Sequence, residues 1–169
     1  MSISLSDASL KTYRQLLPAS SAIMKKAEKY FTDEGANLND LAEMRLIEDM
    51  APLTFQVFSV VHHSVGAIDA LKTGEFAPPK MPENLSFNDL IDMLENAEEK
   101  LNHFSDEDIN SLSGKEVMFR MGQIEWAFTA EDFILSFSLP NFYFHVTTLY
   151  DLFRVCLLYT SDAADENPS

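Results

Sequence analysis

Five polar residues have spacings that could bring their side chains together on two helices. Asp49, Gln56 and His63 follow one another at intervals of seven, so on a helix they form one stripe beside the apolar residues. Asn141 and His145 are four residues apart, and side chains at i and i+4 share one face of a helix. An imidazole ordinarily has a pKa near neutrality and is suited to general acid or base catalysis, although the sequence shows no partner that would orient it. These residues are the candidates for chemistry, and the catalytic residue itself is unknown.

Three interpretations of His145 are open at this point. The ring could lie beside the core and bond to a neighbour, bind a metal ion, or transfer protons without a metal. His62 and His63 are adjacent, so on a helix their side chains diverge by about 100° and do not chelate one ion. Asp49 is one turn from Arg45, with which it could form an ordinary surface ion pair. Each candidate thus has a structural explanation beside the functional one.

Four long segments have the apolar period of amphipathic helices and must position these residues. Pro52 lies inside the second segment and Pro140 inside the fourth, where each removes a backbone donor and predicts a kink or a break. Ser6 and Ser86 are the predicted N-caps of the first and third segments. The predicted helices run from about Asp7 to Thr32, from Leu38 to Leu71, from Ser86 to Asn102 and from Thr129 to Arg154.

Between the third and fourth predicted helices the period changes to that of a strand. The runs from Val117 to Met121 and from Ile124 to Phe128 alternate on either side of Gly122-Gln123. Two short alternating runs around a pair that contains glycine are typical of a β-hairpin. The predicted fold class is therefore all-α, an antiparallel four-helix bundle with a small β-hairpin between helices three and four.

The balance of charge excludes several classes of partner. The chain has 27 acidic and 12 basic residues among 169, a net charge of −15. Nucleic acids and anionic membranes both require clustered Lys and Arg, so neither is expected as a partner. No apolar run approaches the roughly 18 residues of a membrane span, and no signal peptide is visible. A single cysteine, Cys156, excludes an internal disulfide and fits a reducing compartment, so we expect a cytoplasmic protein.

The last fourteen residues differ in character from the rest. The segment from Cys156 to Asp165 (CLLYTSDAAD) resembles one reading frame of the transposase-end adapter used in DNA sequencing libraries. On this hypothesis, residues 1–155 form a single helical domain and residues 156–169 are a non-native read-through tail. The alternative is an ordinary acidic tail.

Two stretches carry a resemblance to a known family. The segments from Leu139 to Arg154 (LPNFYFHVTTLYDLFR) and, less specifically, from Arg45 to Leu53 (RLIEDMAPL) resemble motifs of an uncharacterised family of DinB-like proteins. The resemblance covers about residues 3 to 155 and implies the bundle fold of the DinB superfamily. Many members of that superfamily bind a divalent metal through one His on the second helix and a His-x-x-x-His pair on the fourth, and some are thiol-dependent transferases.

Carried onto this chain, the ligand positions implied by the resemblance are Gln56, Asn141 and His145, so one of the three is a histidine. Amide oxygens are weak ligands for zinc, and a harder ion with water fits such a set better. We expect Gln56, Asn141 and His145 as the metal site, Asp49 and His63 as residues that contact a substrate, and a divalent metal ion as the cofactor.

Two functions are compatible with the sequence, and both stay open. One is an enzyme, a metal-assisted or thiol-type transferase with a site for a small molecule between the second and fourth helices. The other is a non-catalytic helical bundle that forms a homodimer or binds a small ligand. The aromatic fourth helix, with Phe142, Tyr143, Phe144 and Tyr150, favours the second. The expected partners are a small molecule and a second copy of the chain.

Overall fold

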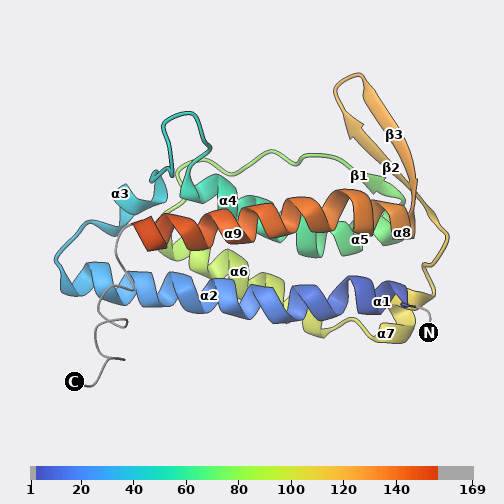
Figure 1. Ribbon diagram of the computed structural model, residues 1–169, viewed down its shortest axis with the longest axis horizontal. Helices are drawn as coiled ribbons and strands as arrows, with labels where there is room; N and C mark the ends of the chain where they lie inside the picture. Colours follow the sequence, from blue (N-terminus) through green and yellow to red (C-terminus); the bar gives the residue numbers. More distant parts are fainter. Residues whose placement is uncertain (1–2, 156–169) are drawn as a thin grey trace, which may run out of the picture.

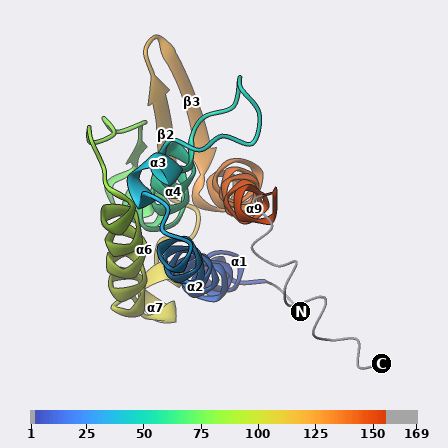
Figure 2. The same cartoon turned by 90° about the vertical axis from the view of Figure 1, so that its left-hand side faces the viewer.

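The computed structural model describes residues 3–155, so the predicted read-through tail lies outside the described residues. Three long α-helices and a fourth, composite helical segment pack side by side (Figure 1; Figure 2). They are α2 (Leu10–Asp33), α6 (Phe87–Asn102), α9 (Leu139–Val155) and the segment made of α4 (Leu53–Val61), η1 (His62–Gly66) and α5 (Ala67–Thr73). The predicted third helix is confirmed together with its cap, because Ser86 and Asp89 form a reciprocal capping box before α6.

The core lies between these helical segments and consists of large apolar side chains. Each helix turns one apolar stripe toward its neighbours, and burial of that stripe, more than helix propensity, stabilises a helix of this kind. Fully buried side chains from the four segments include Leu17, Met24, Val57, Leu71, Leu90, Leu94, Phe142 and Phe153.

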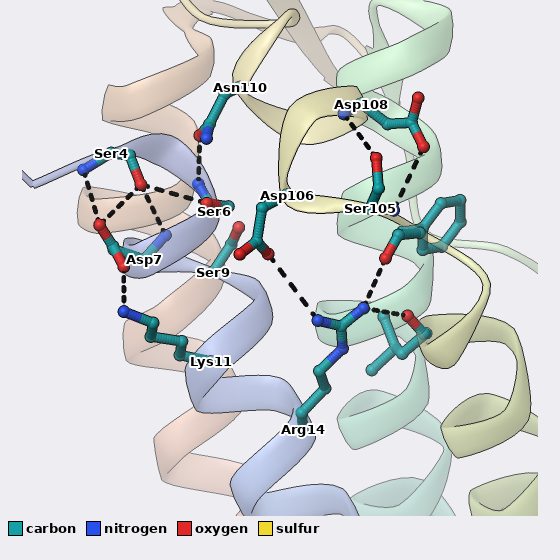
Figure 3. A network of polar contacts seen from close by, with 12 residues as sticks. Ser4, Ser6, Asp7, Ser9, Lys11, Arg14, Ser105, Asp106, Asp108 and Asn110 are labelled. Carbon is teal, nitrogen blue, oxygen red and sulfur yellow. Dashed lines mark hydrogen bonds and ion pairs between the residues drawn. The ribbon is translucent and has the colours of Figure 1, made fainter.

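The first predicted helix is confirmed in extent but begins differently. A short turn, α1 (Leu5–Ala8), precedes α2, and its N-cap is Ser4, whose side chain accepts a hydrogen bond from the backbone N–H of Asp7 (Figure 3). The prediction of Ser6 as the N-cap is therefore wrong. Ser6 lies inside α1 and donates its backbone N–H to Oδ1 of Asn110 over 2.9 Å.

A single arginine joins α2 to the far end of α6. Arg14 donates through Nη2 to the backbone carbonyls of Leu101 and Phe104, and Nη1 lies 3.8 Å from a carboxylate oxygen of Asp106 (Figure 3). Asp106 begins α7 (Asp106–Asn110). The last carbonyls of a helix have few partners within it, so Arg14 adds a charged donor to the backbone at and just after the end of α6.

The predicted helix from Leu38 to Leu71 is wrong over residues 43–52, which form a loop. The short α3 (Leu38–Ala42) ends before this loop, and α4 begins after it. Pro52 is the N-cap of α4, with an extended ψ of 172°, which confirms the break predicted there. Within the loop the side chain of Arg45 donates to the backbone carbonyl of Met50. The apolar residues of the loop match the helical period, but the chain there is not helical.

A small sheet projects from one end of the helices (Figure 1). Strands β2 (Glu116–Met121) and β3 (Ile124–Thr129) form the predicted hairpin, with Gly122 at φ +62° in its turn. The sequence did not predict β1 (Glu75–Phe76), which pairs in parallel with β2 and sets Phe76 opposite Phe119. The fold is therefore mostly helical with a three-stranded mixed sheet, so the all-α class is too narrow. The antiparallel four-helix bundle stays a prediction.

Within residues 3–155, two helical segments contain π-helical turns. One is η1, and the other is η2 (Phe133–Ser138), which lies between α8 (Ala130–Asp132) and α9. The N-cap of α8 is Thr129, so the fourth helical segment begins where the sequence predicts. Ser138 donates its hydroxyl to the backbone carbonyl of His63 over 2.8 Å, and the Tyr13 hydroxyl lies 3.3 Å from the hydroxyl oxygen of Ser138. The η2 turn ends two residues before Pro140, whose missing N–H interrupts the α-helical pattern. A π turn shifts the backbone register and is frequent at functional sites.

No helix within residues 3–155 has the length and apolar character needed to cross a membrane.

Candidate functional site

A cavity of about 380 Å³ opens between the α4–η1 segment and α9. Its walls are largely aromatic, with Phe55 and Phe58 from α4, Phe76 from β1, Phe119 and Trp126 from the hairpin, and Phe137 from η2. Its polar lining consists of Ser59, His62, His63, Asn141 and His145. The proline-rich segment that follows β1 contributes Pro78, Pro79 and Met81. The sheet and the segment after β1 thus complete a site whose remaining walls are helical.

Gln56 and His145 form the central polar contact of this site. Oε1 of Gln56 lies 2.8 Å from Nδ1 of His145, and Nε2 of Gln56 donates to the backbone carbonyl of Ala51 over 3.0 Å. Because an amide oxygen only accepts hydrogen bonds, Nδ1 carries the proton and Nε2 of the neutral ring keeps a free lone pair. This Nε2 has no hydrogen-bond partner within the described part of the chain, and the ring lines the cavity. The protein therefore presents an oriented acceptor to the cavity.

Asn141 lies one helical turn before His145 and lines the same cavity. Its amide nitrogen donates to the backbone carbonyl of Phe137 over 2.7 Å. This bond fixes the amide plane and leaves Oδ1, a second acceptor, without a hydrogen-bond partner among residues 3–155.

His62 and His63 extend the aromatic wall. The ring centroids of His63 and His145 are 6.0 Å apart with planes inclined by 17°, while His62 stacks on Phe76 at 4.2 Å. Nε2 of His62 and Nδ1 of His63 are buried without a hydrogen-bond partner in the described residues. Such atoms are rare in folded proteins, so their presence side by side sets this wall apart from the rest of the core.

Burial lowers the pKa of all three histidines at the cavity. The pKa falls to about 4 for His62 and for His145, in both cases through loss of solvation. Burial lowers the pKa of His63 to about 3, with smaller contributions from the neighbouring His62 and His145. The three rings are therefore neutral at pH 7. No Lys, Arg, Asp or Glu occurs among the described residues that line the cavity.

The structure brings together four of the five predicted site residues. His63, Asn141 and His145 line the cavity, and Gln56 lies behind His145 and holds its ring. Asp49 is exposed in the loop before α4 and does not line the cavity, so its predicted place on the stripe is wrong. The interval of seven aligns side chains only along a continuous helix, and the break at Pro52 separates Asp49 from the other two.

The predicted metal ligands make a poor set of donors. Oε1 of Gln56 already accepts from His145, and the amide of Asn141 donates to the helix backbone, so one ring nitrogen and amide oxygens remain. Divalent transition metals prefer imidazole, thiolate and carboxylate ligands. Residues 3–155 contain no group of three or more His, Cys, Asp and Glu side chains that could hold a metal ion. Metal binding by Gln56, Asn141 and His145 stays a prediction, and the donor chemistry does not fit it.

Several lining residues were not identified from the sequence. Ser59 is three residues after Gln56 and four before His63, so its helical spacing was a usable signal. Phe76 and Trp126 carried no such signal, because they reach the cavity through strand pairing between distant segments.

The fold is similar to that of a solved protein. The crystal structure of a DinB family member protein from Shewanella denitrificans superposes with a TM-score of 0.72 at 23% sequence identity, over 89% of this chain and 84% of that chain. At this identity the likeness concerns the fold alone. No curated protein sequence matches the chain significantly. The family described as a domain of unknown function, DUF1993, matches residues 5–156. The chain, which has a DinB-like fold, therefore belongs to the DUF1993 family.

Proposed function

We propose that the protein binds a small molecule in the cavity between α4–η1 and α9, with Nε2 of His145 as the polar anchor. The observation that carries the proposal is the hydrogen bond from His145 to Gln56, because it fixes the tautomer and leaves Nε2 as an acceptor at the cavity. The volume of about 380 Å³ falls in the range of about 300–1,000 Å³ typical of small-molecule sites. Apolar walls with a few convergent polar groups are also typical of them.

Trp126 allows a direct test, because it is the only tryptophan in the sequence and lines the cavity. A fragment library is screened by tryptophan fluorescence and by thermal denaturation. A fragment present at 100 times its Kd should raise the free energy of unfolding by about 2.7 kcal/mol. The variant His145→Ala should weaken binding, and His103→Ala, which changes an exposed histidine at the end of α6, should not. A library in which no fragment alters either signal would contradict the proposal.

A more specific form of this proposal is an enzyme, a transferase of the metal-assisted or thiol-dependent kind. Its support is the DinB-like resemblance and the lone pair of His145, not the donor set around it. The same resemblance supports the proposal that the four long helical segments form an antiparallel bundle.

Elemental analysis of protein purified without chelator, beside the variant His145→Ala, tests whether the proposed enzyme binds a metal ion. Bound metal at one equivalent that is lost in the variant would support it, and negligible metal in both would remove it.

A second candidate is a homodimer through the outer face of α9. The side chains of Tyr143 and Phe144 are 47% and 55% exposed, which is unusual for large aromatic residues in neighbouring positions. Light scattering across a concentration series, with Phe144→Ser as the variant, distinguishes a dimer from a monomer. A monomer at every concentration would remove this candidate.

A further inference from the structure

We infer that the cavity selects uncharged aromatic molecules that carry a hydroxyl or N–H donor, as in a phenol or an anilide. This inference rests on the proposed function and adds the chemical class of the ligand. Three features of the site support it: the lack of charge, the aromatic walls, and the kind of hydrogen-bonding atom that the protein presents.

The first feature excludes ions. None of the described residues that line the cavity is acidic or basic, and its histidines are neutral at pH 7. A carboxylate or an ammonium group that entered would lose its hydration without gaining a counter-ion, which is strongly unfavourable in an apolar site. The ligand is therefore uncharged when bound.

The second feature favours a flat ring. Phe119 lies 4.8 Å from Phe137 and 5.6 Å from Trp126, centroid to centroid, so three rings gather on the sheet side of the cavity. Phe55 of α4 meets His145 of α9 edge to face at 5.8 Å. Aromatic pairs in offset or edge-to-face geometry are more favourable than the apolar area that they bury would alone make them. An aromatic ligand can therefore continue contacts that the walls already make with one another.

The third feature sets the polarity of the ligand. His145 presents Nε2, which can only accept, since its Nδ1 proton is held by Gln56. One turn earlier, Asn141 uses one of its two amide N–H donors on the helix backbone, and its oxygen has no partner in the described chain. Two acceptor atoms, Nε2 of His145 and Oδ1 of Asn141, thus come from one face of α9 at the cavity. A ligand that offers only acceptors leaves Nε2 of His145 unpaired, so a ligand with a donor is favoured, and the Ser59 hydroxyl, which can donate or accept, does not oppose it.

Isothermal titration calorimetry with four related probes tests the class. The probes are 2-naphthol, 2-methoxynaphthalene, 2-naphthoate and decahydro-2-naphthol, which in turn supply the donor on an aromatic ring, remove the donor, introduce a negative charge and remove the aromaticity. We expect 2-naphthol to bind about tenfold more tightly than 2-methoxynaphthalene, as one additional hydrogen bond allows, and also more tightly than the charged probe and the saturated one. In His145→Phe the advantage of 2-naphthol over 2-methoxynaphthalene should shrink, because only the Asn141 oxygen remains as a fixed acceptor on α9, whereas His103→Phe should keep it.

The order of affinities in the wild-type protein decides the inference even if His145→Phe does not fold. Equal binding of all four probes, or a preference for 2-naphthoate or decahydro-2-naphthol, would overturn the chemical class and leave the proposed function intact. Absence of binding by all four also overturns the class. If the fragment library yields no ligand either, the proposed function fails as well, so the two failures are distinguishable.

Discussion

Oε1 of Gln56 and Nδ1 of His145 are 2.8 Å apart, and this contact links the first turn of α4 to the middle of α9. The link continues to the carbonyl of Ala51, just before the proline that starts α4. The end of the 43–52 loop is thereby connected to the ring that lines the cavity. Any change that shifts this end of α4 should reach His145 through Gln56.

The first prediction concerns the strength of this link. Gln56→Leu leaves the Nδ1 proton of a buried ring without an acceptor and should cost about 1–3 kcal/mol of the free energy of unfolding. His145→Phe leaves the Gln56 oxygen unpaired and should cost a similar amount. The double variant removes both polar partners and should cost less than the sum of the two. Urea denaturation of the wild-type protein, the two single variants and the double variant measures these free energies. If the two single losses add up to the loss in the double variant, the contact between Gln56 and His145 contributes no coupling energy.

The second prediction concerns acid. The pKa values of His62, His63 and His145 are lowered to about 4, 3 and 4, below the ordinary value near 6.5. Between pH 6.5 and 4 the unfolded chain therefore binds more protons than the folded one, and the free energy of unfolding falls as the pH falls. Above pH 6.5 these histidines add no pH dependence. Denaturant titrations across this range should show the fall.

A matched variant identifies the source of this acid sensitivity. His62→Phe keeps a flat ring against Phe76 and removes one titrating group, so the fall of stability with pH should be shallower than in the wild-type protein. If His62→Phe and wild type show the same slope, burial of this ring is not what makes the protein acid-sensitive.

The third prediction concerns Gly66, which lies in the π turn beneath the ring of His62. A Cβ at this position would lie 2.9 Å from Nδ1 of His62, closer than packed atoms allow. Gly66→Ala should force the ring away from Phe76 and destabilise the fold by about 1–2 kcal/mol despite the better helix propensity of alanine. In a His62→Ala background the same change should stabilise by about 0.5–1 kcal/mol, since the clash is gone. Thermal and urea denaturation measure both steps, and the same sign in both backgrounds would argue against the clash.

The fourth prediction concerns the buried hydroxyls that join the two π turns. Ser138→Ala leaves the backbone carbonyl of His63 and the hydroxyl of Tyr13 without their partner, and should cost about 1–3 kcal/mol. Tyr13→Phe keeps the bond from Ser138 to His63 and should cost less. If Tyr13→Phe lowers the free energy of unfolding more than Ser138→Ala does, the hydrogen bond from Ser138 to His63 is not the main stabilising contact of this pair of hydroxyls. Equilibrium denaturation of both variants under one condition decides the order.

Local rules were sufficient for much of this fold. The capping box at Ser86 and the glycine turn at Gly122 are written in a few consecutive residues, and both predicted elements are confirmed. The prediction of a helix through residues 43–52 is wrong because apolar spacing alone does not show whether the backbone is helical. Pro52 was the local signal that the helix is broken.

By itself, the sequence determined which residues could share a helix face, and so it singled out Asn141 with His145 and Gln56 with His63. The tertiary structure alone decided that Gln56 orients His145 instead of joining it as a ligand, and that Asp49 lies outside the site. It also decided that distant strands bring Phe76 and Trp126 to the same cavity. The physical reason is that helical periodicity fixes directions within one segment, whereas the tautomer, the burial and the neighbours of a side chain depend on contacts between segments.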